Sequence, residues 1–240
     1  DSILSMIYLP RSLTILGGGV IACEYAATFA LLGVEVTLID RAPRPLSFMD
    51  PEIVAVFQRS LERQGGRFYV GQTVKEVAWD GVSSVVARLA NGMAVKSEKM
   101  LVALGRQPNV EELNLEAAGL SLNEKGLLPA NDHGQTAVPH IFAAGDILGR
   151  PPALASQAME DGRRAVCHAL GLPVGESANL VPVGIYTIPE IASIGLNEEQ
   201  AGARYRGPLV GRAPFTEIAK GQITGGCEGL LKLIADPSGE

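Results

Sequence analysis

A run of three glycines, Gly17 to Gly19, is the feature with the clearest chemical meaning. An apolar strand pattern at residues 12–16 precedes it, and a helical pattern at residues 20–32 follows it. In a strand–turn–helix unit of this order, Gly17 permits the tight turn and Gly19 lets the backbone approach a pyrophosphate. Ala22 stands where a third glycine is usual, and its methyl group still permits close helix–strand packing. The free N–H groups at the helix start favour phosphate binding.

An acidic residue follows the second predicted strand. That strand covers residues 34–39 and leads to Asp40, 23 residues after Gly17, where a carboxylate accepts hydrogen bonds from ribose hydroxyls. The neighbouring Arg41 and Arg44 either belong to a solvated loop or accommodate the 2′-phosphate of NADP. Asp40 favours NAD and the arginines favour NADP. The sequence therefore predicts a dinucleotide site and leaves both cofactors open.

Composition narrows the class of protein. Of the 240 residues, 47% are hydrophobic and 19% are charged, which suits one large or two ordinary domains. The formal net charge of −6 does not suggest a nucleic-acid partner. The three cysteines, Cys23, Cys167 and Cys227, form no CxxC pair and no zinc spacing, so we expect no metal site and a reducing cytoplasm.

A membrane span is not expected. Residues 12–34 carry a single charge, at Glu24, but three consecutive glycines and strand patterns on both sides argue against a membrane helix. No signal-peptide pattern is visible. The sequence begins at Asp1 without Met and ends in a turn sequence directly after a strand-like run at residues 230–235. We therefore expect a fragment of a longer protein.

The middle of the chain predicts an α/β fold with an antiparallel insertion. Asp50 is a good N-cap for a helix that runs to about residue 64. Three consecutive strands are expected between residues 73 and 103, with a type I′ hairpin turn at Asn91-Gly92. The last part of this region is expected to return to the parallel sheet.

Further elements are predicted in the second half of the chain. A strand of small residues is expected at 141–144, and an amphipathic helix at 153–170. Short strands and a short helix beyond residue 178 indicate a separate α+β segment.

Four blocks of sequence carry a resemblance to a known family. They are GGGVIACEYA from residue 17, LVALGRQPN from residue 101, TAVPHIFAAGD from residue 136 with PALASQAMEDGR after it, and GIYTIPEIASIG from residue 184. In this order they resemble the flavoprotein pyridine nucleotide–disulfide oxidoreductases over essentially the whole chain. The resemblance implies a Rossmann-like NAD(P)-binding domain with an inserted meander, the second segment of an FAD-binding domain, and a truncated dimerisation domain. The corresponding ranges are 1–112, 113–177 and 178–240.

The resemblance also assigns residues to the nicotinamide half of the site. Glu24 matches a glutamate close to the nicotinamide ring, although an ordinary solvent-facing helix residue is the alternative. Val20 stands where some reductases carry a tyrosine that covers the flavin, which implies an ungated site. Gly105 and Arg106 match a turn that borders the nicotinamide, although Gly105 also suits any turn.

Two further residues are assigned to the flavin. Asp146 matches the aspartate that binds the ribityl chain of FAD, with an N-cap as its alternative role. Ala155 lies at the start of the helix whose N-terminus faces the isoalloxazine, where the helix dipole stabilises negative charge.

The resemblance implies an enzyme that uses FAD, NAD and NADP. The intact protein is expected to pass a hydride between NADPH and NAD through FAD, as a homodimer without nucleic-acid or membrane partners. Lipoamide dehydrogenase, which relays electrons through a cysteine pair, is the alternative within the family. A non-catalytic nucleotide-binding module is the alternative from another class. The family's redox cysteines and its histidine–glutamate pair match nothing here, so no catalytic residue is expected within this chain, and the three histidines are interpreted as structural or surface residues.

Overall fold

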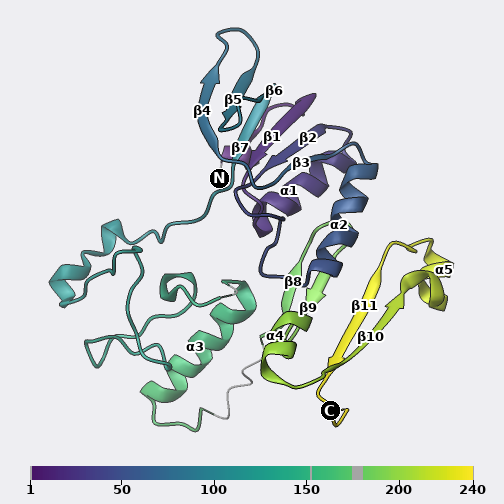
Figure 1. Cartoon of the computed structure of the whole chain (residues 1–240). Helices are drawn as coiled ribbons and strands as arrows, with labels where there is room; N and C mark the ends of the chain where they lie inside the picture. The colour runs from purple at the N-terminus through teal and green to yellow at the C-terminus, as the bar shows by residue number, and fades with distance from the viewer. Residues whose placement is uncertain (1, 152, 175–180, 240) are drawn as a thin grey trace. The chain divides into compact units, whose positions relative to one another are not determined.

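The computed structural model describes residues 2–151, 153–174 and 181–239 (Figure 1). Contacts within the chain divide it into two compact units. The first unit comprises residues 1–105, 184–191 and 196–240, and the second comprises residues 106–183 and 192–195. The three-part division at residues 112 and 177 stays a prediction.

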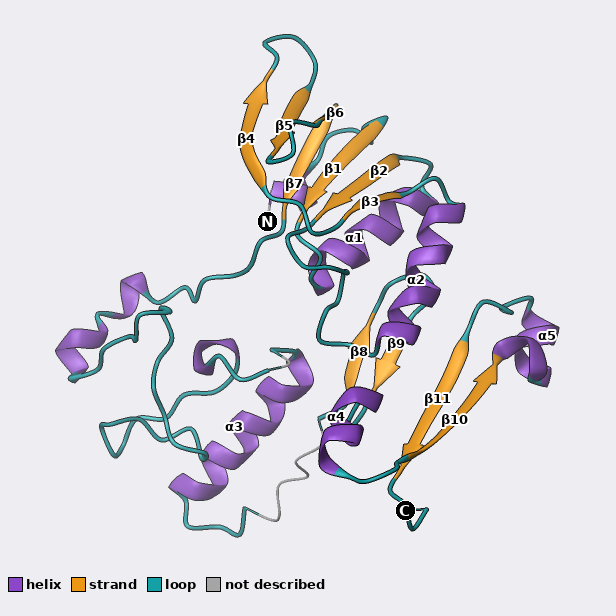
Figure 2. Ribbon diagram, in the orientation of Figure 1, coloured by secondary structure: helices purple, strands orange, loops and turns teal. Residues whose placement is uncertain are grey.

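The first unit contains a four-stranded parallel sheet (Figure 2). Its strands, in spatial order, are β3 (Arg67–Tyr69), β2 (Glu35–Ile39), β1 (Ser12–Leu16) and β7 (Lys99–Val102). The interior strand β1 is paired on both sides and is buried along nearly its whole length, as expected for an apolar central strand. Leu16 pairs with Ile39 on one side and Val102 on the other, so three carboxyl ends meet at one edge.

Two helices cover one face of this sheet, α1 (Val20–Leu31) and α2 (Pro51–Arg63) (Figures 1 and 2). Helix α1 packs closely on the sheet because its buried side chains are mostly alanines. Asp50 caps α2, and its Oδ1 accepts a hydrogen bond from Glu52 N at 2.9 Å. The predicted start of this helix is confirmed.

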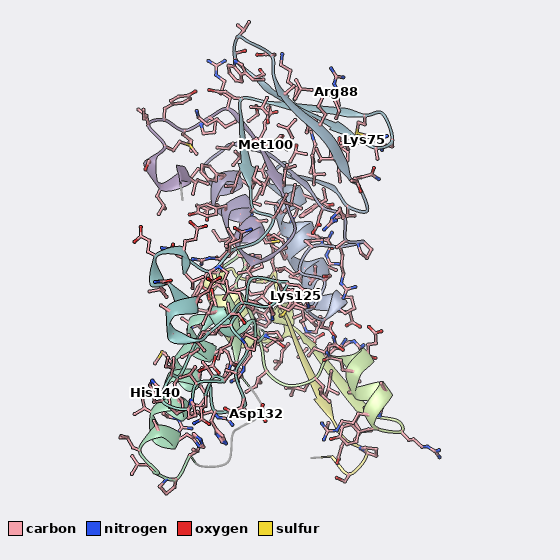
Figure 3. All side chains as sticks on the ribbon, turned by 90° about the vertical axis from the view of Figure 1, so that its left-hand side faces the viewer. Lys75, Arg88, Met100, Lys125, Asp132 and His140 are labelled. Carbon is pink, nitrogen blue, oxygen red and sulfur yellow. The ribbon has the colours of Figure 1, made fainter. Side chains whose placement is uncertain are left out.

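A three-stranded antiparallel meander packs on the parallel sheet. It consists of β4 (Val74–Trp79), β5 (Val85–Leu89) and β6 (Ala94–Ser97). A buried apolar cluster joins the meander to the parallel strands, and its members are Leu16, Ile39, Ala87, Leu89 and Val95. The polar side of the meander carries exposed side chains such as Lys75 on β4 and Arg88 on β5, which Figure 3 labels. The predicted α/β class with an inserted meander is confirmed.

The turn between β5 and β6 differs from the prediction. A type I′ turn needs a positive φ at both central residues, but only Gly92 has one, at 88°. Gly92 N donates to Leu89 O at 3.1 Å, and Leu89 N donates to Met93 O at 2.8 Å. These bonds close a three-residue loop at residues 90–92, in which Gly92 adopts the left-handed conformation. The hairpin is confirmed, and the type I′ assignment is wrong because the loop is one residue longer.

The second unit has little regular structure apart from one long helix. Its elements are the short 3₁₀ helices η2 (Glu111–Leu113), η3 (Leu115–Ala118) and η4 (Asp146–Leu148), and the α-helix α3 (Ala155–Ala169). The prediction of a strand at 141–144 is wrong. An isolated bridge pairs Phe142 with Gln135, and no described strand runs beside this segment to extend the pairing. Helix α3 begins two residues later than predicted, since Ala153 has a φ of 55°.

The remaining elements follow residue 182. They are β8 (Val183–Ile185), β9 (Ile191–Ser193), α4 (Glu198–Arg204), β10 (Leu209–Pro214), η5 (Phe215–Glu217), α5 (Ala219–Thr224) and β11 (Leu230–Ala235). Asn197 and Gln200 form a reciprocal capping box at the start of α4. Strands β10 and β11 pair as an antiparallel hairpin, with Arg212 opposite Lys232.

Candidate functional site

The glycine turn lies at the carboxyl edge of the parallel sheet, between the ends of β2 and β7. Gly17 has a φ of 113°, and its N–H donates to Ile39 O at 2.8 Å. A Cβ at Gly17 would lie 2.4 Å from Ala103 O, much closer than carbon and oxygen approach without a bond. The turn therefore requires glycine at this position both for its backbone conformation and for space.

Asp40 lies directly against the turn. A Cβ at the buried Gly18 would lie 2.2 Å from Asp40 Oδ2, so a larger residue there would displace the carboxylate from its present position. Asp40 is half-buried, and its Oδ1 accepts a hydrogen bond from Ala42 N at 3.2 Å. Sequence reasoning missed Gly18. The signal was the triple glycine, because the fingerprint needs only its first and third members.

The N-terminus of α1 presents backbone donors beside Gly19. The first backbone hydrogen bond of the helix joins Cys23 N to Gly19 O at 3.0 Å, so the N–H groups of residues 20–22 precede it. Within the described residues, no side chain caps this end. A Cβ at the exposed Gly19 would meet no atom within 4 Å. Open space in front of uncapped donors fits a pyrophosphate.

Cys23 lies behind the turn and is fully buried. Its Sγ lies 3.5 Å from Gly18 O. Burial raises the pKa of the thiol, and the charges of Asp40 and Glu24 act in the same direction. Cys23 therefore packs behind the glycine turn as a buried thiol, an environment that disfavours the nucleophilic thiolate.

The two arginines that follow β2 have different environments. Arg41 is exposed. Arg44 is half-buried, and its Nη2 donates to Ser47 O at 2.8 Å and to Met49 O at 3.1 Å. Arg41 directly follows Asp40 in the chain. One edge of the Arg44 guanidinium faces carbonyl groups of its own loop.

The other residues assigned to the nicotinamide half lie on α1 and at positions 105 and 106, where the chain passes from the first unit to the second. Val20 is half-buried in the first turn of α1. Glu24 lies one turn further on, and its Oε1 accepts a hydrogen bond from Tyr186 N at 2.8 Å. Gly105, with a φ of 142°, is the last residue of that stretch of the first unit, and Arg106 belongs to the second unit.

A cavity of about 610 Å³ in the second unit contains two of the predicted site residues, Arg106 and Asp146. Asp146 is exposed and starts η4. The rest of the lining is largely apolar and includes Leu113, Leu128 and Phe142. A carboxylate at the wall of an apolar cavity suits a ligand that combines a ring system with hydroxyl groups.

The loop that carries Asp146 is fixed to α3 by a buried ion pair that sequence reasoning missed. Arg150 Nη1 lies 3.1 Å from Asp161 Oδ1, and the Asp161 side chain is only 1% exposed. Asp161 also accepts hydrogen bonds from Gln157 Nε2 at 2.8 Å and from Gly145 N at 3.3 Å. The pair therefore holds the residue before Asp146 in place. Ala155 begins α3, and no described side chain caps this helix start.

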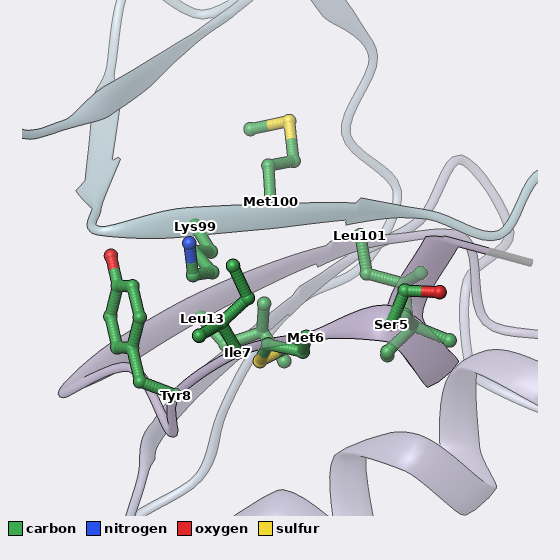
Figure 4. A pocket seen from close by; sticks show the side chains of 9 residues that line it. Ser5, Met6, Ile7, Tyr8, Leu13, Lys99, Met100 and Leu101 are labelled. Carbon is green, nitrogen blue, oxygen red and sulfur yellow. The ribbon is translucent and has the colours of Figure 1, made fainter.

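A second cavity, of about 300 Å³, lies away from the glycine turn (Figure 4). It is lined by residues that precede β1, such as Ile7, by Leu13 of β1, and by β7 residues such as Met100. Figure 4 shows Lys99 beside the ring of Tyr8, and its Nζ lies 4.3 Å from the ring centroid. None of the predicted site residues lines this cavity.

Two of the three histidines pack against each other. His133 and His168 stack with ring centroids 4.3 Å apart, and Phe142 packs edge-on against His168. Within the described ranges, no group of three or more His, Cys, Asp or Glu side chains is arranged to hold a metal ion. None of the described helices combines the length and apolar character needed to cross a membrane.

Comparison with protein families agrees with this geometry. The profile described as pyridine nucleotide-disulphide oxidoreductase matches residues 3–162. The chain belongs to this family. The dimerisation-domain profile of the same family matches residues 181–240. The resemblance drawn from the four sequence blocks is thereby confirmed.

Individual relatives show how the chain relates to longer proteins. It is 42% identical over 234 residues to the soluble pyridine nucleotide transhydrogenase of Marinomonas sp. (strain MWYL1), covering 98% of this chain and 50% of the relative. It is 39% identical over 234 residues to dihydrolipoyl dehydrogenase of Bacillus subtilis (strain 168), covering 98% of this chain and 51% of the relative. The chain spans about half the length of the curated relatives it matches.

Solved structures of longer proteins are similar to this chain in fold. LpdA from Mycobacterium tuberculosis matches with a TM-score of 0.88 and 28% identity, over 98% of this chain and 51% of that chain. The Cu(II) complex of the HOCl-induced flavoprotein disulfide reductase RclA from Escherichia coli matches with a TM-score of 0.90 and 27% identity, over 99% of this chain and 54% of that chain.

Proposed function

We propose that this chain is the nicotinamide-nucleotide-binding portion of a soluble pyridine nucleotide transhydrogenase, an FAD-dependent oxidoreductase that transfers hydride between NADPH and NAD. The phosphate cradle at Gly17–Gly19, with Asp40 against it, is the observation that carries the proposal. The identity of 42% to a transhydrogenase supports the choice of reaction.

The cradle binds the nucleotide through backbone groups. Gly17 and Gly19 let the chain pass close to the pyrophosphate, and the N–H groups before Cys23 donate to it. Ala22, which is fully buried, lets α1 pack on the sheet behind the cradle. Asp40 accepts hydrogen bonds from ribose hydroxyls of the adenosine half. These contacts orient the nucleotide, and orientation is a large part of what a protein contributes to hydride transfer.

The nicotinamide end and the flavin involve other residues. Glu24, Val20 and the turn of Gly105 and Arg106 border the nicotinamide. When bound, FAD supplies the group that accepts hydride from one nucleotide and returns it to the other. Asp146 accepts hydrogen bonds from hydroxyls of the ribityl chain, and the first-turn N–H groups that begin at Ala155 stabilise negative charge through the helix dipole.

The organisation of the whole protein is part of the same proposal. Residues 1–112 form the NAD(P)-binding domain, 113–177 belong to the FAD-binding domain and 178–240 to a dimerisation domain. The match of residues 181–240 to a dimerisation profile supports a homodimer. The three cysteines are all free, and several relatives are named soluble pyridine nucleotide transhydrogenases, and both observations support a cytoplasmic location.

Steady-state kinetics of the full-length, FAD-loaded protein test the reaction. Both nucleotides use one site in turn, so a ping-pong mechanism follows, and double-reciprocal plots with NADPH and NAD are expected to give parallel lines. Intersecting lines would contradict a shared site. Absence of hydride transfer between the two nucleotides by the FAD-loaded protein would contradict the proposed reaction itself.

A dihydrolipoyl dehydrogenase is the second candidate, because a relative of that name is 39% identical. Oxidation of dihydrolipoamide with NAD, at a rate above that of hydride transfer from NADPH, would favour it. A full-length protein that binds nucleotides but neither retains FAD nor turns over would instead favour a non-catalytic nucleotide-binding module.

A further inference from the structure

The loop formed by residues 41–49 connects β2 to α2 and contacts the glycine turn directly. Leu46 N donates to Gly18 O at 2.7 Å, and the Leu46 side chain is fully buried. The backbone of Leu46 has a φ of 45°, which an L residue adopts only when its surroundings hold it there. Gly18 also lies against Asp40, so this one glycine contacts both the 41–49 loop and the Asp40 carboxylate.

Arg44 holds this loop from within. Its Nη2 bridges Ser47 O at 2.8 Å and Met49 O at 3.1 Å, on the two sides of Phe48. Its Nε is shielded from solvent and has no hydrogen-bond partner among the described residues. A guanidinium that is half-buried and bonded to two carbonyls folds the end of the loop. Arg41 is exposed and forms no hydrogen bond or ion pair with the described residues.

The far end of the loop is anchored by a lysine from β11. Asp50 directly follows the loop, and its Oδ2 lies 2.8 Å from Lys232 Nζ. The Lys232 side chain is only 4% exposed, and its Nζ also lies 2.6 Å from Glu198 Oε2. Arg212, opposite Lys232 in the hairpin, donates to Glu52 from Nε at 2.7 Å and from Nη2 at 2.6 Å. A buried lysine among carboxylates is a rigid anchor, because displacing it would leave charges unpaired.

We propose that Arg44 and Lys232 are positioning residues for the nucleotide. Lys232 forms an ion pair with Asp50 at the end of the loop. Arg44 donates hydrogen bonds to two carbonyls within the loop. The N–H of Leu46 then joins the loop to the Gly18 carbonyl. The inference rests on the proposed nucleotide site, and neither residue touches the nucleotide. Arg41 is then the residue that distinguishes a 2′-phosphate from a 2′-hydroxyl. Precise sites depend on such supporting contacts behind the groups that meet the ligand.

Equilibrium titration of the 240-residue chain with NADH and with NADPH tests the assignment. Arg44→Gln and Lys232→Met are each expected to raise both dissociation constants by the same factor, roughly tenfold, and to leave their ratio unchanged. Arg41→Gln is expected to raise the NADPH constant alone, by about tenfold. Lys75→Met and Arg206→Gln remove exposed charges that lie outside this network and are expected to change neither constant.

Two further measurements separate positioning from simple stabilisation. The Arg44→Gln/Lys232→Met double variant is expected to bind no more than about twofold more weakly than the weaker single variant, because both changes release the same loop. Thermal unfolding shows which variants are folded at the titration temperature. If Lys232→Met does not fold, Asp50→Asn replaces it, since the amide oxygen still caps α2 while the charge that holds Lys232 is removed.

Each contrary result overturns a defined part of the inference. Loss of NADPH affinity alone in Arg44→Gln would make Arg44 a phosphate ligand. Unchanged affinities in a folded Lys232→Met or Asp50→Asn variant, or factors that multiply in the double variant, would remove the link from β11 to the loop. A folded wild-type chain that binds neither nucleotide would instead refute the proposed function, whereas binding by the wild type with insensitive variants refutes only this inference.

Discussion

Substitution of Gly19 by alanine separates nucleotide binding from folding. Gly19 has φ −77° and ψ −175°, which alanine adopts readily, and a Cβ there meets no atom of the chain within 4 Å. Alanine reduces the entropy of the unfolded chain, which stabilises the fold by about 0.4–1 kcal/mol. Alanine is also a poorer N-cap than glycine, which costs about 0.5–1 kcal/mol. The free energy of unfolding is therefore expected to change by less than about 1 kcal/mol.

The same methyl group occupies the space in which the backbone approaches the pyrophosphate. The dissociation constant of NADH is expected to rise at least about tenfold, or 1.4 kcal/mol. Gly17→Ala is the matched comparison, because its Cβ would lie 2.4 Å from Ala103 O at a φ of 113°. That change is expected to lower the free energy of unfolding by about 1–3 kcal/mol or more.

Denaturant unfolding and nicotinamide fluorescence measure the two quantities on the same samples. Wild-type affinity for NADH in a folded Gly19→Ala variant would refute the placement of the pyrophosphate. A large loss of stability in Gly19→Ala, comparable with that of Gly17→Ala, would refute the open space in front of Gly19.

Three further predictions concern charge and burial. Asp161→Ala leaves Arg150 without its buried partner and is expected to lower the stability of the second unit by about 3 kcal/mol, measured by amide hydrogen exchange. The pKa of Glu52 is lowered from 4.5 to about 2, chiefly by the hydrogen bond from Arg212. The resulting stabilisation is present above pH 4.5 and is lost as the pH falls towards 2, and Arg212→Gln is expected to flatten that part of the unfolding profile. Cys23, whose thiol pKa is raised by burial, is expected to react with iodoacetamide at neutral pH only after unfolding, as mass spectrometry can show.

Sequence reasoning succeeded where the structure depends on local spacing. The strand, turn and helix from Ser12 to Leu31 and the start of α2 at Pro51 lie where turn and cap residues predict them. It failed where neighbours in space decide. The segment at 141–144 has strand-like residues but no long strand beside it. The hairpin at Asn91-Gly92 has the expected residues, but the pairing of Leu89 with Met93 lengthens the loop.

The ion pairs and hydrogen bonds that hold the candidate site in place could not be predicted from the sequence either. Lys232 and Asp50 are separated by 182 residues, and Arg150 and Asp161 by 11, so no local pattern joins either pair. Arg44 could be recognised as a cation near Asp40, but the direction of its guanidinium depends on how its loop folds. Composition and spacing identify groups that can meet a ligand, whereas three-dimensional contacts identify the groups that hold them.

Titration of the folded 240-residue chain with NADH, followed by nicotinamide fluorescence, shows whether the glycine turn binds a nucleotide. We expect saturable binding of one nucleotide per chain, weakened in Asp40→Asn and in Gly19→Ala while both variants remain folded. A folded wild-type chain that shows no saturable binding, or binding that neither variant weakens, would contradict the nucleotide site at the glycine turn.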